Sequence, residues 1–173
     1  MPTGQSTLFN DPIYFDASKN PFVPTYIGQC TWYCWSKAHS KAAGYPDRNL
    51  DVSNLPTGNA GDWADIAEKN GYTVSMTPKA DCIAVWNGHV AYVETVDGDD
   101  ICFSEANWNN TPNASGTIQV PNDFVESIRK YVAELTSGVT VLSGGTDGEF
   151  KTLSLETFKN RGNKGFKGFI YLN

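Results

Sequence analysis

The feature of this chain that most constrains its fold is the pair Asn87-Gly88, which lies between two apolar runs. An Asn-Gly pair in this setting is the strongest short-range signal of a β-hairpin, because both residues accept the positive φ of a type I′ turn. A second turn and a third apolar run follow. The three runs cover residues 82–86, 89–94 and 101–108. The pattern predicts a three-stranded antiparallel meander.

Helical periodicity occurs on both sides of the meander. Residues 30–43 contain no Gly or Pro and repeat small or apolar side chains every four positions, which predicts a helix that Gly44 ends. Shorter helices are expected at residues 60–70 and 123–135. Further strands are expected at residues 72–76, 139–142, 150–155 and 168–172. Because helices come first and most of the sheet follows, the chain is predicted to be α+β, with N-terminal helices packed on an antiparallel β-sheet.

The length and composition favour one globular domain without a nucleic-acid or membrane partner. The chain has 173 residues, 40% of them hydrophobic, and a net charge of -6 with no cluster of Lys and Arg to bind phosphates. No apolar run reaches membrane-spanning length, and the first residues lack the basic and apolar regions of a signal peptide. Residues 1–24, which hold several Pro and aromatic residues, are expected to form an arm over a domain of residues 25–173.

The register of the meander decides whether its polar side chains can meet. His89 begins the second strand, and Glu105 and Asn107 lie on the third run. If Thr95 pairs with Ile101, His89 sits opposite Asn107 and diagonal to Glu105, so all three share one face. A register shifted by one residue would disperse them. The first register is therefore the prediction.

Cys30 is the candidate nucleophile. It follows a glycine turn and begins the first predicted helix, where the macrodipole and free backbone N–H groups favour a thiolate. A cysteine nucleophile needs a base within hydrogen-bond reach, and histidine is the usual base near neutral pH. Of the two histidines, His39 lies more than two helical turns from Cys30, so His89 is the predicted base.

Two residues could orient His89, and the residue pattern does not choose between them. Glu105 could hold the second ring nitrogen, while Asn107 could do the same or bind substrate. The backbone N–H of Cys30 is the expected donor to the oxyanion, with the side chain of Gln29 as a second candidate. The predicted reaction is attack by the Cys30 thiolate on an amide carbonyl, formation of a thioester, and hydrolysis by a water that His89 activates.

No metal or cofactor is predicted. The cysteines and histidines lack the spacing of a zinc site, the acidic turn at residues 97–100 lacks a full calcium loop, and no phosphate-binding glycine motif is present. The predicted register puts Cys82 and Cys102 on opposite faces, so no disulfide is expected between them. Aromatic side chains can stack on sugars, and Trp32 and Trp108 are the candidates for substrate contact.

Several ordered motifs resemble the CHAP family, the cysteine, histidine-dependent amidohydrolases and peptidases that cut bacterial peptidoglycan. The matching motifs are GQCTWY at residues 28–33, GHVAYVE at 88–94, SEANW at 104–108 and GFIY at 168–171. The resemblance covers residues 25–173, which it implies are a CHAP catalytic domain of papain-like fold. It further implies a Cys30-His89-Glu105 triad with Asn107 assisting, and hydrolysis of either the muramoyl-alanine amide or a peptide cross-link.

The resemblance also implies where the protein acts. Family members occur in phage endolysins, virion-associated lysins and secreted bacterial wall hydrolases. Without a signal peptide, the chain is expected to be phage-encoded or a fragment of a longer secreted protein. Anionic wall polymers would repel its negative charge, so a separate wall-binding domain or subunit is expected to supply targeting.

Two alternatives remain open at this point. A non-catalytic domain of the same fold could bind wall glycan or peptide in an aromatic cleft, and the thiol would then be incidental. A cysteine amidase or transglutaminase would keep the nucleophile but act on another amide.

Overall fold

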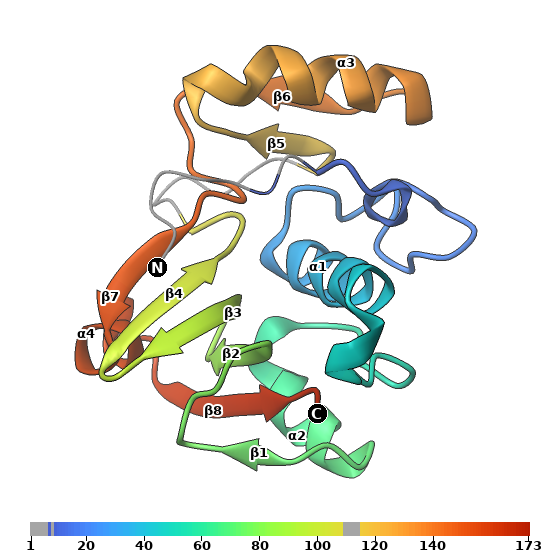
Figure 1. The fold of residues 1–173 in the computed structure, drawn as a ribbon. Helices are drawn as coiled ribbons and strands as arrows, with labels where there is room; N and C mark the ends of the chain where they lie inside the picture. Colours follow the sequence, from blue (N-terminus) through green and yellow to red (C-terminus); the bar gives the residue numbers. More distant parts are fainter. Residues whose placement is uncertain (1–6, 8, 109–114) are drawn as a thin grey trace.

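The structure of the protein is a computed structural model that describes residues 7, 9–108 and 115–173. A six-stranded antiparallel sheet is packed against helices, and a smaller two-stranded sheet lies beside it (Figure 1). The α-helices of the described residues are α1 (Cys30–Gly44), α2 (Trp63–Lys69), α3 (Val125–Leu135) and α4 (Leu155–Lys159). None of them has the length and apolar character needed to cross a membrane. The predicted α+β class is confirmed.

The large sheet contains the predicted meander at its centre. Its strands follow the order β1-β8-β2-β3-β4-β7, and every neighbouring pair is antiparallel. These strands are β1 (Val74–Ser75), β2 (Cys82–Trp86), β3 (His89–Asp97), β4 (Asp100–Ser104), β7 (Lys151–Ser154) and β8 (Phe166–Tyr171). The hairpin turn at Asn87-Gly88 joins β2 to β3 as expected, with Trp86 paired to His89.

The small sheet was only partly expected. Strand β5 (Thr117–Gln119) pairs with β6 (Thr140–Leu142) in parallel, and α3 connects the two (Figure 1). Sequence patterning predicts α3 and β6 but no strand at residues 117–119. A strand of this length with one buried residue, Ile118, is too short to show a period of two.

The register between β3 and β4 follows the shifted alternative near the turn and the predicted one farther from it. Next to the turn, Val96 pairs with Ile101, so the expected pairing of Thr95 with Ile101 is wrong. The register then shifts by one residue at Glu94, which forms a β-bulge. Beyond the bulge, the partners are the predicted ones. Strand β4 ends at Ser104, so the prediction of a single strand over residues 101–108 is wrong for its last four residues, and Glu105 and Asn107 lie beyond the paired segment.

The bulge lies where α1 is held to the sheet. The carboxylate of Glu94 is buried, accepts a hydrogen bond from Ser104 Oγ at 2.8 Å, and lies 3.3 Å from Lys37 Nζ and 3.1 Å from Lys41 Nζ. Both lysines belong to α1. A buried ion pair costs desolvation of both partners, and loss of either partner leaves an uncompensated buried charge, so these contacts hold α1 against β3.

Apolar side chains cover both faces of the central strands. Ile83 and Val85 pack toward α1, while Ala84 and Trp86 pack toward Phe158 of α4. Every residue of β2 is consequently buried. Cys82 shares the face of Ala84 and Trp86.

The cysteines of the sheet follow the same alternation. Ile101 and Phe103 belong to the apolar cluster that contains Cys82, so Cys102, which lies between them, points to the opposite face. Neither Cys82 nor Cys102 takes part in a disulfide bond.

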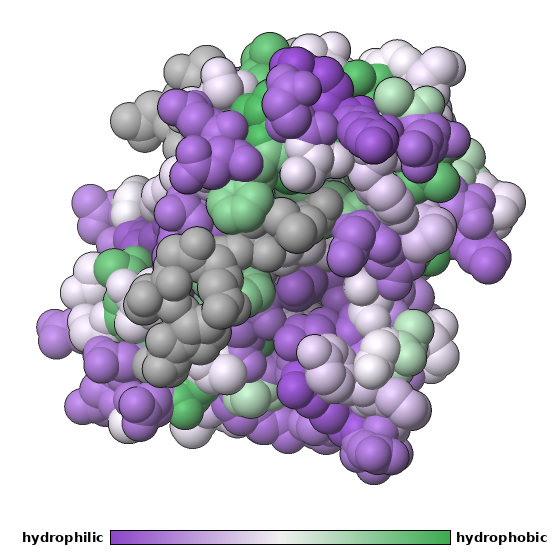
Figure 2. Space-filling view, turned by 45° about the horizontal axis from the view of Figure 1, so that its top comes forward, coloured by the Kyte–Doolittle hydropathy of each residue, from purple (hydrophilic) through white to green (hydrophobic). Residues whose placement is uncertain are grey.

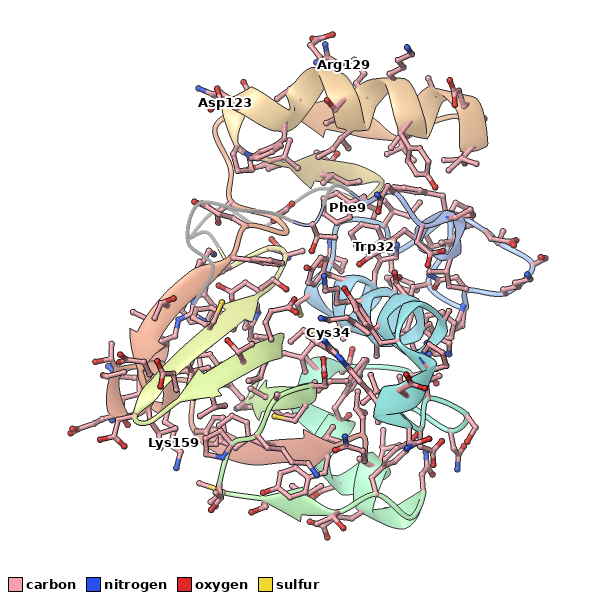
Figure 3. All side chains as sticks on the ribbon, viewed as in Figure 1. Phe9, Trp32, Cys34, Asp123, Arg129 and Lys159 are labelled. Carbon is pink, nitrogen blue, oxygen red and sulfur yellow. The ribbon has the colours of Figure 1, made fainter. Side chains whose placement is uncertain are left out.

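The aromatic residues of the N-terminal arm are part of the core. Phe9, Tyr14 and Phe15 are buried, and all three rings contact Trp32 of α1. Figure 3 shows Phe9 and Trp32 side by side above α1. Residues before position 25 therefore contribute to the packing of the domain as well as covering it.

Gly28 delivers the chain to α1 through a conformation that only glycine accepts without strain. Its φ is +97°, and a Cβ atom at this position would lie 1.8 Å from the carbonyl oxygen of Thr117 in β5. The neighbouring Gly116 N–H donates a hydrogen bond to the carbonyl of Ile27 at 2.9 Å. The turn before α1 is thus packed directly against the backbone of β5.

We expect Gly28→Ala to lower the free energy of unfolding by more than about 2 kcal/mol, because both the backbone angle and the carbonyl of Thr117 oppose a side chain there. Gly44→Ala is the matched control. A Cβ atom at Gly44 meets nothing within 4 Å, so that change should stay within about 1 kcal/mol. Urea unfolding of both variants checks the prediction. Equal effects of the two substitutions would contradict it.

Candidate active site

Cys30 is the first residue of α1 and lies at the edge of a cleft of about 720 Å³. The residue is 8% exposed. The opposite walls of this cleft, which we call the Cys30 cleft, come from residues 57–62 and from the hairpin turn Asn87-Gly88. A thiol at this place is accessible from the cleft while most of its surface is packed.

His89 and Cys30 are joined by a side-chain hydrogen bond. Burial by itself raises the pKa of Cys30, but the hydrogen bond and charge of His89 outweigh it, aided by the N–H groups of Val90 and Thr31, so that pKa is lowered. Burial by itself lowers the pKa of His89, but Cys30 and Glu105 raise it to about 9. Opposite shifts of this kind favour a thiolate beside an imidazolium.

Glu105 holds the second ring nitrogen of His89. The distance from His89 Nε2 to Glu105 Oε1 is 2.8 Å, and the carboxylate is fully buried. This contact leaves Nδ1 of the ring for Cys30. Of the two acceptors that the residue pattern leaves open, the structure brings Glu105 onto the imidazole.

Asn107 lies beside Gln29 instead. Its side-chain Nδ2 donates to Gln29 Oε1 at 2.9 Å, and its backbone N–H donates to Asp147 Oδ1 at 2.8 Å. Asn107 has φ +60°, a left-handed conformation that asparagine tolerates better than most residues. Gln29 precedes Cys30 and lines the Cys30 cleft. Asn107 therefore contacts the residue proposed for the oxyanion.

Two cations that sequence reasoning missed complete the surroundings of Glu105. Arg161 Nη1 lies 2.8 Å from Glu105 Oε1, Arg161 Nη2 lies 2.6 Å from Oε2, and Lys151 Nζ lies 2.9 Å from Oε2. Burial alone raises the pKa of Glu105, but hydrogen bonds from Arg161 and His89 and the charge of Lys151 hold that pKa well below its usual range. No local motif could reveal these contacts, since the two cations lie 56 and 46 residues from Glu105 in the chain.

The two tryptophans expected to contact substrate lie in different environments. Trp108 is half-buried, and its ring centroid is 4.8 Å from that of His89 in an edge-on arrangement. Trp32 is fully buried, and its Nε1 donates to the carbonyl oxygen of Tyr14 at 2.8 Å. The expectation that Trp32 contacts substrate is wrong, because its position on α1 directs the ring into the aromatic arm.

The second histidine stays away from the site. His39 stacks on Trp35 with ring centroids 3.6 Å apart, and its Nδ1 lies 2.9 Å from the Trp35 carbonyl oxygen. Burial lowers the pKa of His39, which is opposite to the shift of His89. Among the described residues, no group of three or more His, Cys, Asp or Glu side chains could hold a metal ion.

Comparison with known proteins identifies relatives of part of the chain. The CHAP domain model matches residues 20–107, just over half of the chain. Staphylococcal secretory antigen ssaA2 of Staphylococcus aureus is 37% identical over 90 residues, which are 49% of this chain and 30% of that protein. Staphylococcal secretory antigen SsaA is 35% identical over 88 residues, 48% of this chain and 30% of that protein. The chain thus spans less than a third of the length of these curated relatives.

Solved structures of similar chains were also found. An N-acetylmuramoyl-L-alanine amidase from Staphylococcus aureus has a TM-score of 0.44 at 21% identity, over 84% of this chain and 31% of that chain. Ly7917 has a TM-score of 0.44 at 16% identity, over 96% of this chain and 63% of that chain. The family match spans Cys30, His89, Glu105 and Asn107. The chain therefore belongs to the CHAP domain family of amidohydrolases and peptidases, whose members act on peptidoglycan.

Proposed function

We propose that this chain hydrolyses an amide bond of bacterial peptidoglycan, with Cys30 as nucleophile and His89 as general acid and base. The observation that carries the proposal is the continuous chain of contacts from the Cys30 thiol through His89 to the buried carboxylate of Glu105, placed at the wall of an open cleft. Membership in the CHAP domain family supports peptidoglycan as the substrate. The bond cut is either the muramoyl-alanine amide or a peptide cross-link.

The reaction starts from the thiolate and imidazolium that the opposite pKa shifts favour. The Cys30 thiolate attacks the amide carbonyl, and the tetrahedral intermediate collapses to a thioester as His89 gives its proton to the leaving amine. Neutral His89 then takes a proton from water, and the resulting hydroxide attacks the thioester. Collapse of this second intermediate releases the carboxylic acid and returns the thiolate and the imidazolium. Glu105 stays ionised throughout and keeps the ring in one orientation.

The developing oxyanion is stabilised at the start of α1. The backbone N–H of Cys30 is one donor there, and the macrodipole of α1 adds a favourable field. Gln29 supplies the second donor through its side-chain nitrogen. Asn107 contacts the oxygen of the same amide at 2.9 Å, which orients the nitrogen of Gln29.

Targeting to the wall is assigned to another part of the natural protein or to a second subunit. The net charge of -6 opposes attraction to anionic wall polymers, and hydrophilic residues cover most of the face shown in Figure 2. The curated relatives are more than three times as long as the region they share with this chain. Their names describe secretory antigens, which favours a secreted bacterial origin over a phage origin.

Alkylation rates should single out Cys30. At about pH 6, iodoacetamide should modify Cys30 faster than the other cysteines, because burial raises the pKa of Cys34, Cys102 and Cys82, the last to about 12. Mass spectrometry of tryptic peptides measures the four rates. His89→Ala should slow the labelling of Cys30, and His39→Ala is the matched control without effect. Equal, slow labelling of all four thiols would favour a non-catalytic binding domain.

The pH dependence of kcat/KM should reflect the titration of Cys30 and His89. When pH falls through the lowered pKa of Cys30, the thiolate is protonated and the rate declines. When pH rises through about 9, His89 loses its proton and the rate declines again. We therefore expect a plateau that extends on the alkaline side to about pH 9. An alkaline limb near 6.5, the ordinary pKa of histidine, would contradict the assigned pair.

Digestion of purified peptidoglycan identifies the reaction. Cys30→Ala should reduce the release of muropeptides by at least about 10³-fold while the protein stays folded. Cys34→Ala, one helical turn away, should retain turnover and serves as the control. Mass spectrometry of the products distinguishes the bonds, because an amidase frees muramoyl groups and an endopeptidase frees cross-link termini. Absence of any release by the unmodified chain would remove peptidoglycan as the substrate and favour another amide.

A further inference from the structure

Glu105 is in contact with two cations in addition to His89. Arg161 binds both carboxylate oxygens, at 2.8 and 2.6 Å, and Lys151 binds Oε2 at 2.9 Å. Lys151 lies on β7 and Arg161 begins the 3-10 turn Arg161–Asn163. Both positions lie outside residues 20–107, the part of the chain that the CHAP domain model matches. The C-terminal part of the chain thus adds two cations to the site.

The turn that carries Arg161 is held firmly in place. The side chain of Arg161 is 9% exposed, and its guanidinium carbon lies 3.8 Å from the centre of the Trp108 ring. On one side of Arg161, the carbonyl oxygen of Lys159 accepts a hydrogen bond from Trp86 Nε1 at 2.9 Å. On the other side, the carbonyl oxygen of Lys164 accepts a hydrogen bond from the backbone N–H of Asn87, in the hairpin turn, at 3.1 Å.

We infer that Arg161 is a positioning residue for His89 that acts through Glu105. Its two N–H groups fix both carboxylate oxygens, so that Oε1 stays in line with His89 Nε2. Its positive charge, together with that of Lys151, offsets the negative charge of Glu105 that the imidazole experiences. The catalytic role of Arg161 rests on the proposed hydrolase function, whereas its effect on the titration of His89 does not depend on that function.

The charges around the pair determine the direction of the effect. Cys30 and Glu105 are the ionisable groups in contact with His89. Arg161, Lys151 and His89 surround Glu105, and the thiol of Cys34 interacts with it electrostatically. An isolated carboxylate in a buried site would hold the imidazolium proton strongly. Two cations on that carboxylate weaken this hold, which lets His89 release its proton to the leaving amine.

The test is a titration of the two histidine rings by NMR in the full chain. Arg161→Met removes one cation, so the pKa of His89 should rise from about 9 by about one unit. The alkaline limb of kcat/KM should move by the same amount. Arg161→Lys keeps the charge and should return the His89 titration close to that of the unmodified chain. The signal of His39 is well separated, because burial lowers the pKa of that residue.

Matched variants separate this role from a general effect of losing an arginine. Arg129→Met removes an exposed arginine that pairs with Glu126 on α3, and it should leave both histidine titrations unchanged. If Arg161→Met does not fold, Lys151→Met removes the more exposed cation and should shift His89 in the same direction. An unchanged or lowered pKa of His89 in the folded variants would overturn the inference. A chain that shows the shift but releases nothing from peptidoglycan would refute the proposed function alone.

Discussion

The site depends on one fully buried carboxylate. An ionised group away from water is tolerated only when hydrogen bonds and opposite charges compensate for its lost solvation. Glu105 meets this requirement through His89, Arg161 and Lys151, with contacts of 2.6 to 2.9 Å. These three partners come from the start of β3, from the turn after α4 and from β7. The contacts that keep Glu105 ionised in the interior therefore also fix the orientation of the His89 ring.

A second buried carboxylate lies between the helix that begins at Cys30 and the strand that begins at His89. Glu94 lies at the β-bulge of β3 and contacts Lys37 and Lys41 of α1. The bulge brings the strand ends into the register that aligns the polar side chains, and the lysines hold the helix beside the same strand. Two sets of contacts therefore join α1 to β3. One consists of the ion pairs of Glu94 with the lysines, and the other is the hydrogen bond between Cys30 and His89.

The residues that the CHAP domain model matches are in close contact with the β5-α3-β6 unit that follows them in the chain. Gly28 approaches the backbone of Thr117 so closely that no side chain fits between them. Asp147 links the same regions, since its carboxylate accepts from the backbone N–H groups of Asn107 and Gln119 at 2.8 and 2.7 Å. The conformation of Asn107, and through it the side chain of Gln29, is therefore coupled to a unit outside the family match.

Local sequence by itself determined the hairpin at Asn87-Gly88, the helix that begins at Cys30, and the α+β arrangement. These features depend on turn preferences and periodicities within a few residues. Those signals also pointed to Cys30, His89 and Glu105. Only the tertiary structure decided between Glu105 and Asn107 as the contact of His89, because β4 ends at Ser104 and the left-handed conformation of Asn107 turns the chain toward Gln29.

Tertiary structure also decided the features that have no local signal. The register predicted near the turn was wrong because β3 has a bulge at Glu94, whose carboxylate contacts lysines of a helix more than fifty residues earlier in the chain. Trp32 is buried because an N-terminal arm without periodicity folds onto it. Arg161 reaches Glu105 from 56 residues away. In each case the deciding contact joins residues remote in sequence, and local patterns contain no information about such distances.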